Sequence, residues 1–97
     1  MYSPTRLVSH TRVRDPLGAK GMCDALVFTP EKYFPVDMLM EAFQQSVLNT
    51  RGILRTCGAT PEGNLLVVVT DIDEVRQLLI ETSQLPSILR ALEKGTS

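Results

Sequence analysis

The chain has 97 residues, 43% of them hydrophobic and 22% charged, which is typical of one globular domain rather than of a disordered or fibrous chain. Ten basic and eleven acidic residues give a formal net charge of -1, so no overall field attracts the chain to nucleic acid or to an anionic membrane surface. The longest apolar run extends only from Leu65 to Val69, far below the roughly 20 residues that cross a bilayer. We therefore expect neither a membrane nor a nucleic-acid partner.

The N-terminal segment is basic. Residues 1–20 hold four basic side chains and one acidic side chain, so they carry +3 while the rest of the chain carries -4. Residues 6–13 alternate roughly between β-branched and polar side chains, which predicts a short exposed strand. We expect a basic N-terminal arm or edge strand over residues 1–20 and a single α+β domain over residues 21–97. The side chains of this arm that could contact RNA or an acidic partner are Tyr2, Arg6, His10, Arg12 and Arg14, although short basic termini are more often simply solvated. For a protein interface we select Arg6, Arg12 and Arg14.

A strand and a helix are predicted next. Residues 22–29 are typical of a strand that ends at Pro30, because proline has no N–H for a ladder hydrogen bond. From residue 36 to about residue 50 the apolar side chains recur with the helical period, and Gly52 follows where a C-terminal cap is expected. We predict one amphipathic helix here, with an apolar face made of Val36, Leu39, Met40, Phe43, Val47 and Leu48.

A β-hairpin follows this helix. Residues 53–59 and 64–70 are both typical of strands. They flank the sequence Thr-Pro-Glu-Gly, with proline at the second position and glycine at the fourth, which suits a type I turn.

A second helix is predicted from Asp71 to Thr82. Asp71 with Glu74 three residues later resembles a capping box, and the apolar side chains that follow keep the helical period. The acidic trio Asp71, Asp73 and Glu74 could be ligands of Mg²⁺. Acids at the start of a helix more simply cap its free amides and complement its dipole, and we favour that interpretation.

The end of the chain has two interpretations. Pro86 interrupts the second helix, yet the apolar side chains at positions 85, 88, 89 and 92 keep helical spacing, and Gly95 would cap a further helix. Residues 88–92 could instead form a fourth strand. Local propensity favours the helix.

These elements indicate an α+β fold, a two-layer sandwich with a β-α-β-β-α core and an ambiguous C-terminal helix or strand. Residues 25–28 and 65–69 are apolar at both odd and even positions, whereas a strand with one solvated face should alternate. Because two helices cover one sheet face only, we expect the N-terminal arm, a second copy of the chain or a different protein on the other face. The candidate interface side chains from these strands are Leu26, Phe28, Leu66 and Val68.

The sequence predicts no catalytic, cofactor or metal site. Cys23 and Cys57 lack the close pairing that marks structural zinc sites, and the only histidine, His10, lies on the predicted arm. A cysteine nucleophile would need a base and an orienting group, so we expect two buried free thiols and no enzyme. No apolar leader of the signal-peptide kind precedes the cysteines, so the expected location is the cytoplasm or another reducing compartment, an organellar matrix included.

One segment resembles a known family. Residues 63–79 read Gly-Asn-Leu-Leu-Val-Val-Val-Thr-Asp-Ile-Asp-Glu-Val-Arg-Gln-Leu-Leu, and residues 84–88 read Gln-Leu-Pro-Ser-Ile. This pattern is similar to the central strand and second helix of small ferredoxin-like domains, in particular the maturation chaperones of periplasmic nitrate reductase and the sensing domains of amino-acid-responsive regulators. The resemblance implies a non-catalytic domain that binds a protein or senses a small molecule and pairs through its sheet.

A second resemblance covers residues 24–69, which follow the order strand, Pro-Val-Asp, amphipathic helix, Gly-Ile-Leu-Arg-Thr and hairpin. This order is similar to the N-terminal piece of condensation and acyltransferase domains of the chloramphenicol acetyltransferase type. Those enzymes depend on a His-His-x-x-x-Asp-Gly motif, which this chain lacks. The resemblance therefore implies a fragment without chemistry.

We expect a small non-enzymatic interaction module, an accessory subunit or chaperone-like adaptor that binds a partner through an apolar sheet face or a sheet edge. That partner would be another protein or a further copy in a homo-oligomer. The alternative is a ligand-sensing oligomeric domain that holds a small metabolite between protomers.

Overall fold

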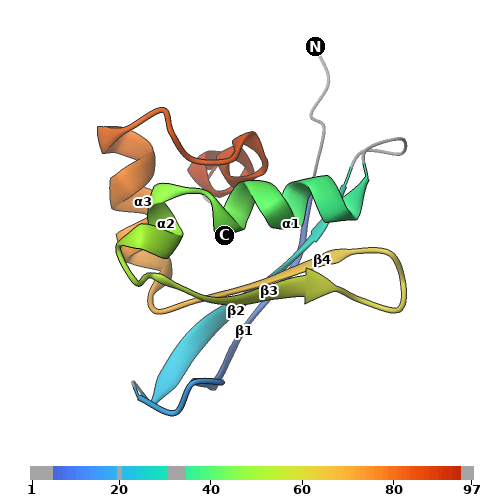
Figure 1. The fold of residues 1–97 in the computed structure, drawn as a ribbon, viewed down its shortest axis with the longest axis horizontal. Coiled ribbons are helices and arrows are strands. Elements are labelled where there is room, and N and C mark those ends of the chain that lie inside the picture. Colours follow the sequence, from blue (N-terminus) through green and yellow to red (C-terminus); the bar gives the residue numbers. More distant parts are fainter. Residues whose placement is uncertain (1–5, 20, 31–34, 95–97) are drawn as a thin grey trace.

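All the helical segments lie on one side of a four-stranded antiparallel sheet (Figure 1). The computed structural model describes residues 6–19, 21–30 and 35–94. This is the predicted α+β class with two layers. The strands are β1 (Arg6–Arg14), β2 (Met22–Thr29), β3 (Leu54–Ala59) and β4 (Leu65–Val69), and the helices are α1 (Val36–Gln44), α2 (Val47–Thr50), α3 (Ile72–Glu81) and the 3-10 helix η1 (Ser87–Lys94).

The sheet has the strand order β1-β2-β4-β3, and each neighbouring pair is antiparallel. β1 pairs with β2 from Arg6 opposite Thr29 to Arg14 opposite Met22, with one register shift between Leu7 and Ser9. Of the two forms considered for the N-terminal segment, an arm or an edge strand, residues 6–14 therefore form the edge strand.

The cross-strand register decides which side chains share a face, because directly opposite residues in an antiparallel pair point the same way. Leu26 lies opposite Val67, and Val67 lies opposite Cys57, so this row faces the helices. The neighbouring row faces away from them and joins Ala25, Val68 and Thr56.

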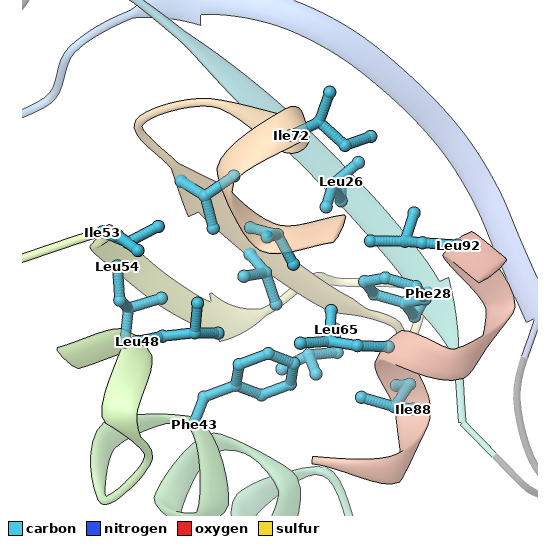
Figure 2. Packing of buried hydrophobic residues seen from close by; sticks show 14 of the residues in the cluster. Leu26, Phe28, Phe43, Leu48, Ile53, Leu54, Leu65, Ile72, Ile88 and Leu92 are labelled. Atoms are coloured by element: carbon cyan, nitrogen blue, oxygen red, sulfur yellow. The ribbon is translucent and has the colours of Figure 1, made fainter. Parts of the chain in front are cut away.

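The main core fills the space between the sheet and the helices (Figure 2). Phe28 of β2 and Phe43 of α1 are fully buried in it, and Ile88 of η1 closes the same cluster. The two central strands, β2 and β4, contribute their helix-side residues to this core. This accounts for about half of their apolar side chains. The remaining apolar residues of β2 and β4 belong to the opposite face.

The helix predicted over residues 36–50 is wrong at its centre, since α1 ends at Gln44 and α2 starts at Val47. Ser46 between them has an extended backbone, with ψ of 168°, and its buried hydroxyl donates to the Phe43 carbonyl at 2.7 Å. Serine competes for helical carbonyls in this way, so the break has a local cause. Because the apolar side chains continue with the helical period across the break, the pattern alone does not reveal it.

The predicted hairpin and second helix are confirmed. The amide of Gly63 donates to the Thr60 carbonyl at 2.9 Å, and Gly63 has the positive φ of 85° that ends the turn. α3 begins after Asp71, whose carboxylate accepts a hydrogen bond from the Asp73 amide at 2.7 Å. Asp71 is thus the N-cap that the sequence predicted.

The C-terminal tail is helical, so its strand alternative is wrong. Residues 87–94 form η1, which buries Ile88, Leu89 and Leu92 against the core. A fourth strand beside β2 would need the edge that β1 already occupies. None of the helices in the described ranges has the length and apolar character needed to cross a bilayer.

Candidate interaction surface

The four strand residues predicted for an interface do not form one surface. Leu26 and Phe28 are fully buried in the core beneath the helices. Leu66 and Val68 lie on the opposite face of the sheet, which no helix covers. We call this surface the helix-free face, made by Val13 of β1, Cys23, Ala25 and Val27 of β2, Thr56 and Gly58 of β3, and Leu66 and Val68 of β4.

The helix-free face is apolar at its centre and only partly accessible. Cys23, Ala25 and Val68 form a small cluster in which no member is more than 5% exposed. Leu66 packs against this cluster and stays half-buried, and its cross-strand partner Val27 is also half-buried. A partner can therefore contact the half-buried side chains of Leu66 and Val27, whereas the small side chains between the strands are already buried.

One end of the helix-free face is closed by an ion pair. Arg55 of β3 donates to Asp15, in the turn after β1, through Nε to Oδ1 at 3.1 Å and through Nη2 to Oδ2 at 3.0 Å. The Asp15 side chain is fully buried, and it also accepts hydrogen bonds from the amides of Leu17 and Ala19. Because β2 and β4 lie between β1 and β3, this contact spans the two central strands.

The hydrogen bonds of Arg55 to Asp15 also affect its charge. The hydrogen bonds that Arg55 donates to Asp15 raise the pKa of Arg55, and the charge interaction with Cys23 acts in the same direction. Cys23 points away from the helices, since it belongs to the cluster of Ala25 and Val68. The ion pair therefore joins the β1–β2 turn to β3, while Val13 and Leu66 pack against the cluster.

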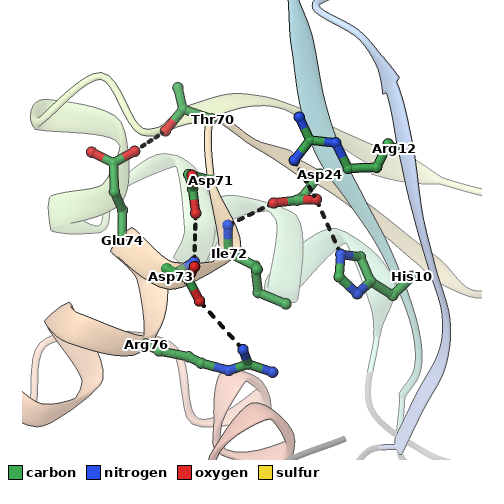
Figure 3. Close-up of polar contacts among 9 residues, drawn as sticks. All are labelled: His10, Arg12, Asp24, Thr70, Asp71, Ile72, Asp73, Glu74 and Arg76. Carbon is green, nitrogen blue, oxygen red and sulfur yellow. Dashed lines mark hydrogen bonds and ion pairs between the residues drawn. The ribbon is translucent and has the colours of Figure 1, made fainter. Parts of the chain in front are cut away.

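A second polar cluster lies on the helix side of the sheet (Figure 3). Asp24 of β2 is 2% exposed, and its Oδ2 accepts a hydrogen bond from the Ile72 amide at the start of α3 at 2.7 Å. Its Oδ1 accepts from His10 Nε2 at 3.1 Å and pairs with Arg12 at 3.4 Å. The carboxylate thus joins β1, β2 and the N-terminus of α3.

The pKa of Asp24 reflects this environment. Burial alone would raise the pKa, but the hydrogen bonds from Ile72 and His10 and the positive charge of Arg12 outweigh it, so the pKa lies below its usual value. The hydrogen bonds of Asp24 to His10, Arg12 and the Ile72 amide join three secondary-structure elements. Sequence reasoning missed this role, although an aspartate inside an apolar strand is a signal that a buried partner exists.

The predicted arm residues are spread over both sides of β1. Arg12 points to the helix side, where it meets Asp24, and Arg14 shares that side because it lies opposite Met22, two residues from Asp24. Arg6 lies opposite Thr29 and shares the helix-free side with Val27. All three are exposed, so β1 presents cations along one edge of the sheet.

The cysteines and the histidine do not come together. Cys23 lies on the helix-free face, while Cys57 lies on the helix side of β3, where its thiol contacts the Met40 carbonyl at 3.8 Å. Burial raises the pKa of Cys57. Within the described part of the chain, no group of three His, Cys, Asp or Glu side chains could hold a metal ion.

A shallow hollow of about 390 Å³ lies beside β3. Its lining is largely polar and comes from three elements, with Gln44 at the end of α1, Asn49 from α2, and β3 itself. The side-chain amide of Asn49 donates to the Gln44 carbonyl at 2.8 Å, which fixes one wall. The β3 residues that line it are Leu54, Arg55, Thr56 and Cys57.

Comparisons with known proteins found no matching family model, no matching curated protein and no matching solved structure.

Proposed function

We propose that the chain is a small, non-enzymatic interaction module that binds a partner protein through the helix-free face of its sheet. The observation that carries this proposal is that both central strands are apolar on the side that no helix covers, with Leu66 and Val27 paired on that side. A chain that needed this face only for solvent contact would be expected to alternate apolar and polar residues along these strands. We place its action in a reducing compartment such as the cytoplasm, in keeping with the free thiols of Cys23 and Cys57.

The accessible apolar area of the helix-free face limits the binding free energy that it can supply. Leu66, Val27 and Val13 are half-buried, so covering them contributes on the order of 3 kcal/mol, which is less than the cost of association. Affinity therefore also requires contacts at the rim of the face. The rim residues Thr11 and Thr56 are exposed on β1 and β3 and offer hydroxyl groups for hydrogen bonds.

The experiment compares capture of partners by three forms of the chain. The wild type, Leu66→Glu and Ile80→Glu are immobilised and exposed to extract from the native source, and each captured protein is then purified and its Kd measured. Leu66 lies on the helix-free face, while Ile80 is 80% exposed on α3, so the second variant is a matched control with the same charge change.

The proposal predicts a protein whose Kd rises at least tenfold with Leu66→Glu and stays unchanged with Ile80→Glu. Equal binding to all three forms would contradict it. A partner whose binding is lost with Ile80→Glu but not with Leu66→Glu would also contradict it, because that result would assign binding to the helical layer.

A second candidate function is a ligand-sensing oligomeric domain, and the hollow beside β3 is the observation that favours it. Its volume falls within the range of small-molecule sites, and Gln44, Asn49 and Arg55 supply polar groups. The test measures the melting temperatures of the wild type and of Asn49→Leu with each of a panel of small polar metabolites. A metabolite that raises the melting temperature of the wild type alone would support this candidate. No shift with any metabolite would leave the interaction module as the only proposal.

A further inference from the structure

β1 forms an outer edge of the sheet, and its ionisable side chains are three arginines and one histidine. It pairs with β2 on one side, and no described strand pairs with its other side. Among the described residues, no other main-chain hydrogen bond reaches Arg6–Arg14. An edge strand points every second N–H and C=O outward, so this edge keeps main-chain groups that another strand can bind.

The pairing with β2 sets the direction of the side chains on this edge. The register shifts between Leu7 and Ser9 and is regular from Ser9 to Arg14. Successive side chains of a strand point to opposite faces, so two rows alternate along this segment. The basic row lies on the helix side and consists of His10, Arg12 and Arg14, while the row on the helix-free side consists of Ser9, Thr11 and Val13.

The chain itself neutralises the basic row only in part (Figure 3). One carboxylate, that of Asp24, bonds to both His10 and Arg12, and Arg12 still has a side chain that is 58% exposed. Arg14 is exposed, lies opposite Met22 and takes part in no ion pair among the described residues. The open side of β1 therefore presents more positive charge than Asp24 balances.

The spacing of the basic row fits carboxylates on an added strand. Residues two positions apart in a strand lie about 6.7 Å apart, and this repeat is the same in a neighbouring strand. A strand with an acidic residue at every second position therefore places carboxylates beside His10, Arg12 and Arg14. Its remaining side chains lie beside Ser9 and Thr11, whose exposed hydroxyl groups suit threonine or serine as cross-strand neighbours.

We propose that β1 binds an acidic extended segment of a partner protein, which adds to the sheet as a fifth strand with alternate Asp or Glu side chains beside the basic row. Main-chain hydrogen bonds supply affinity, and the carboxylates select the segment and its register. The inference does not rest on the proposed function, because a strand beside β1 continues the sheet and leaves Leu66 on the helix-free face accessible.

Other occupants fit this edge less well. A second copy of the chain would offer its own β1, which repeats the same cations, or its β3, which has no acidic side chain. A nucleic acid supplies negative charge but no peptide N–H and C=O groups to match the edge. β1 also has no Phe, Tyr or Trp on which bases could stack.

The experiment measures the binding of fluorescein-labelled peptides to the full chain by fluorescence anisotropy. The alternating peptide is Thr-Glu-Thr-Glu-Val-Glu-Thr, and the block peptide of the same composition is Thr-Thr-Glu-Glu-Glu-Val-Thr. We expect the alternating peptide to bind at least fivefold more tightly, because only its acids all lie on the side of the basic row. Salt should weaken this binding, since it screens exposed charges.

N-methylation of the alternating peptide tests the main-chain pairing. One form is methylated on the amides of the three Glu residues, and the other on the amides of the three residues that follow them. Because alternate amides of a strand point to opposite edges, only one set faces β1. One form should therefore lose binding while the other keeps it, and equal binding of the two forms would contradict strand addition.

Charge reversal on the chain tests the role of the basic row. Arg14→Glu should raise the Kd of the alternating peptide at least tenfold. Arg51→Glu is the matched control, because Arg51 is also exposed but follows α2, and it should change the Kd less than twofold. Leu66→Glu should leave the Kd unchanged, which separates this result from the test of the proposed function. Circular dichroism melting curves check that each variant folds.

The two peptides also test the inference on the wild type alone. No binding of the alternating peptide, or equal affinity for the alternating and block peptides, would overturn it. Equal effects of Arg14→Glu and Arg51→Glu would do the same, because they would reduce the contact to general charge attraction. An oligouridine RNA that binds the wild type in place of the peptide would assign the edge to nucleic acid instead.

Discussion

Arg55 and Asp15 are 40 residues apart in sequence, and two hydrogen bonds of 3.1 and 3.0 Å join their side chains across the central strands of the sheet. The contact links β3 to the turn between β1 and β2, two parts of the sheet that share no ladder hydrogen bonds. On the same face, Cys23, Ala25 and Val68 are at most 5% exposed in the isolated chain, and Val13 and Leu66 pack against them. The helix-free face is thus partly stabilised by the chain's own side chains.

Removing the buried carboxylate should therefore destabilise the fold. Asp15→Ala breaks the pair and frees the amides of Leu17 and Ala19, and we expect a loss on the order of 3 kcal/mol in the free energy of unfolding. Urea denaturation measures it. Arg55→Ala should also lower stability, while Arg51→Ala, which removes an exposed arginine four residues earlier, should have little effect. Equal stability of the two arginine variants would contradict the role assigned to the pair.

Asp24 should stabilise the N-terminus of α3 by accepting the hydrogen bond of the Ile72 amide. Asp24→Ala leaves the Ile72 amide without its acceptor in a buried position, and we expect a loss of about 2 kcal/mol in the free energy of unfolding. Asp24→Asn keeps an oxygen that can accept this bond, so it should cost less. Thermal or urea unfolding of the two variants beside the wild type would show whether the order holds.

The contribution of Asp24 should also depend on pH. Because its pKa is lower in the folded state than the ordinary 3.8, the stabilisation is fully present above that value and is lost as the pH falls through the folded pKa. The stability difference between the wild type and Asp24→Asn should thus be largest near neutral pH and should shrink in acid. A difference that stays constant from pH 7 to pH 2 would show that the carboxylate charge plays no part.

The two thiols should differ in reactivity. Cys23 is fully buried, so it should react with a thiol reagent only when the chain unfolds. Cys57 is half-buried and its pKa is raised by burial, so it should react slowly and only at a higher pH than a free thiol needs. Labelling rates of Cys23→Ala and Cys57→Ala against pH assign each reaction. Fast labelling of Cys23 in the folded chain would show that the helix-free face opens.

β1 should be necessary for the fold. Removing residues 1–14 takes away the partner of β2 along its whole length, including Leu7, which packs against the main core. We expect this shortened chain to lose its cooperative melting transition. A melting temperature within a few degrees of the full chain would mean that the sheet is complete without β1.

The sequence predicted those parts of the fold that local patterns determine. Two strand-like segments on either side of a turn sequence that ends at Gly63 predicted the hairpin, and the spacing of Asp71 and Glu74 predicted the start of α3. The break at Ser46 was not predicted, because the apolar period of residues 36–50 continues across it. The tail was ambiguous because its apolar spacing fits both a helix and a short strand. Local propensity favoured the helix, and the position of β1 in the sheet excludes the strand.

The candidate surface depended on register, which the sequence left open. An apolar run such as residues 25–28 does not reveal which alternate residues face the helices. Leu26 and Phe28 proved to be core residues, whereas Leu66 lies on the face without helices. The contact between Arg55 and Asp15 had no local signal at all, since it joins residues 40 positions apart.

The central claim is that a partner covers the helix-free face, and side-chain footprinting tests it most directly. The complex formed with the captured partner and the isolated chain are labelled with a carbene reagent, and the modification of each side chain is compared by mass spectrometry. We predict that Leu66 and Val27 lose labelling in the complex, while Ile80 on α3 and Met38 on α1 keep theirs. Unchanged labelling of Leu66, with protection confined to the helices, would contradict the account.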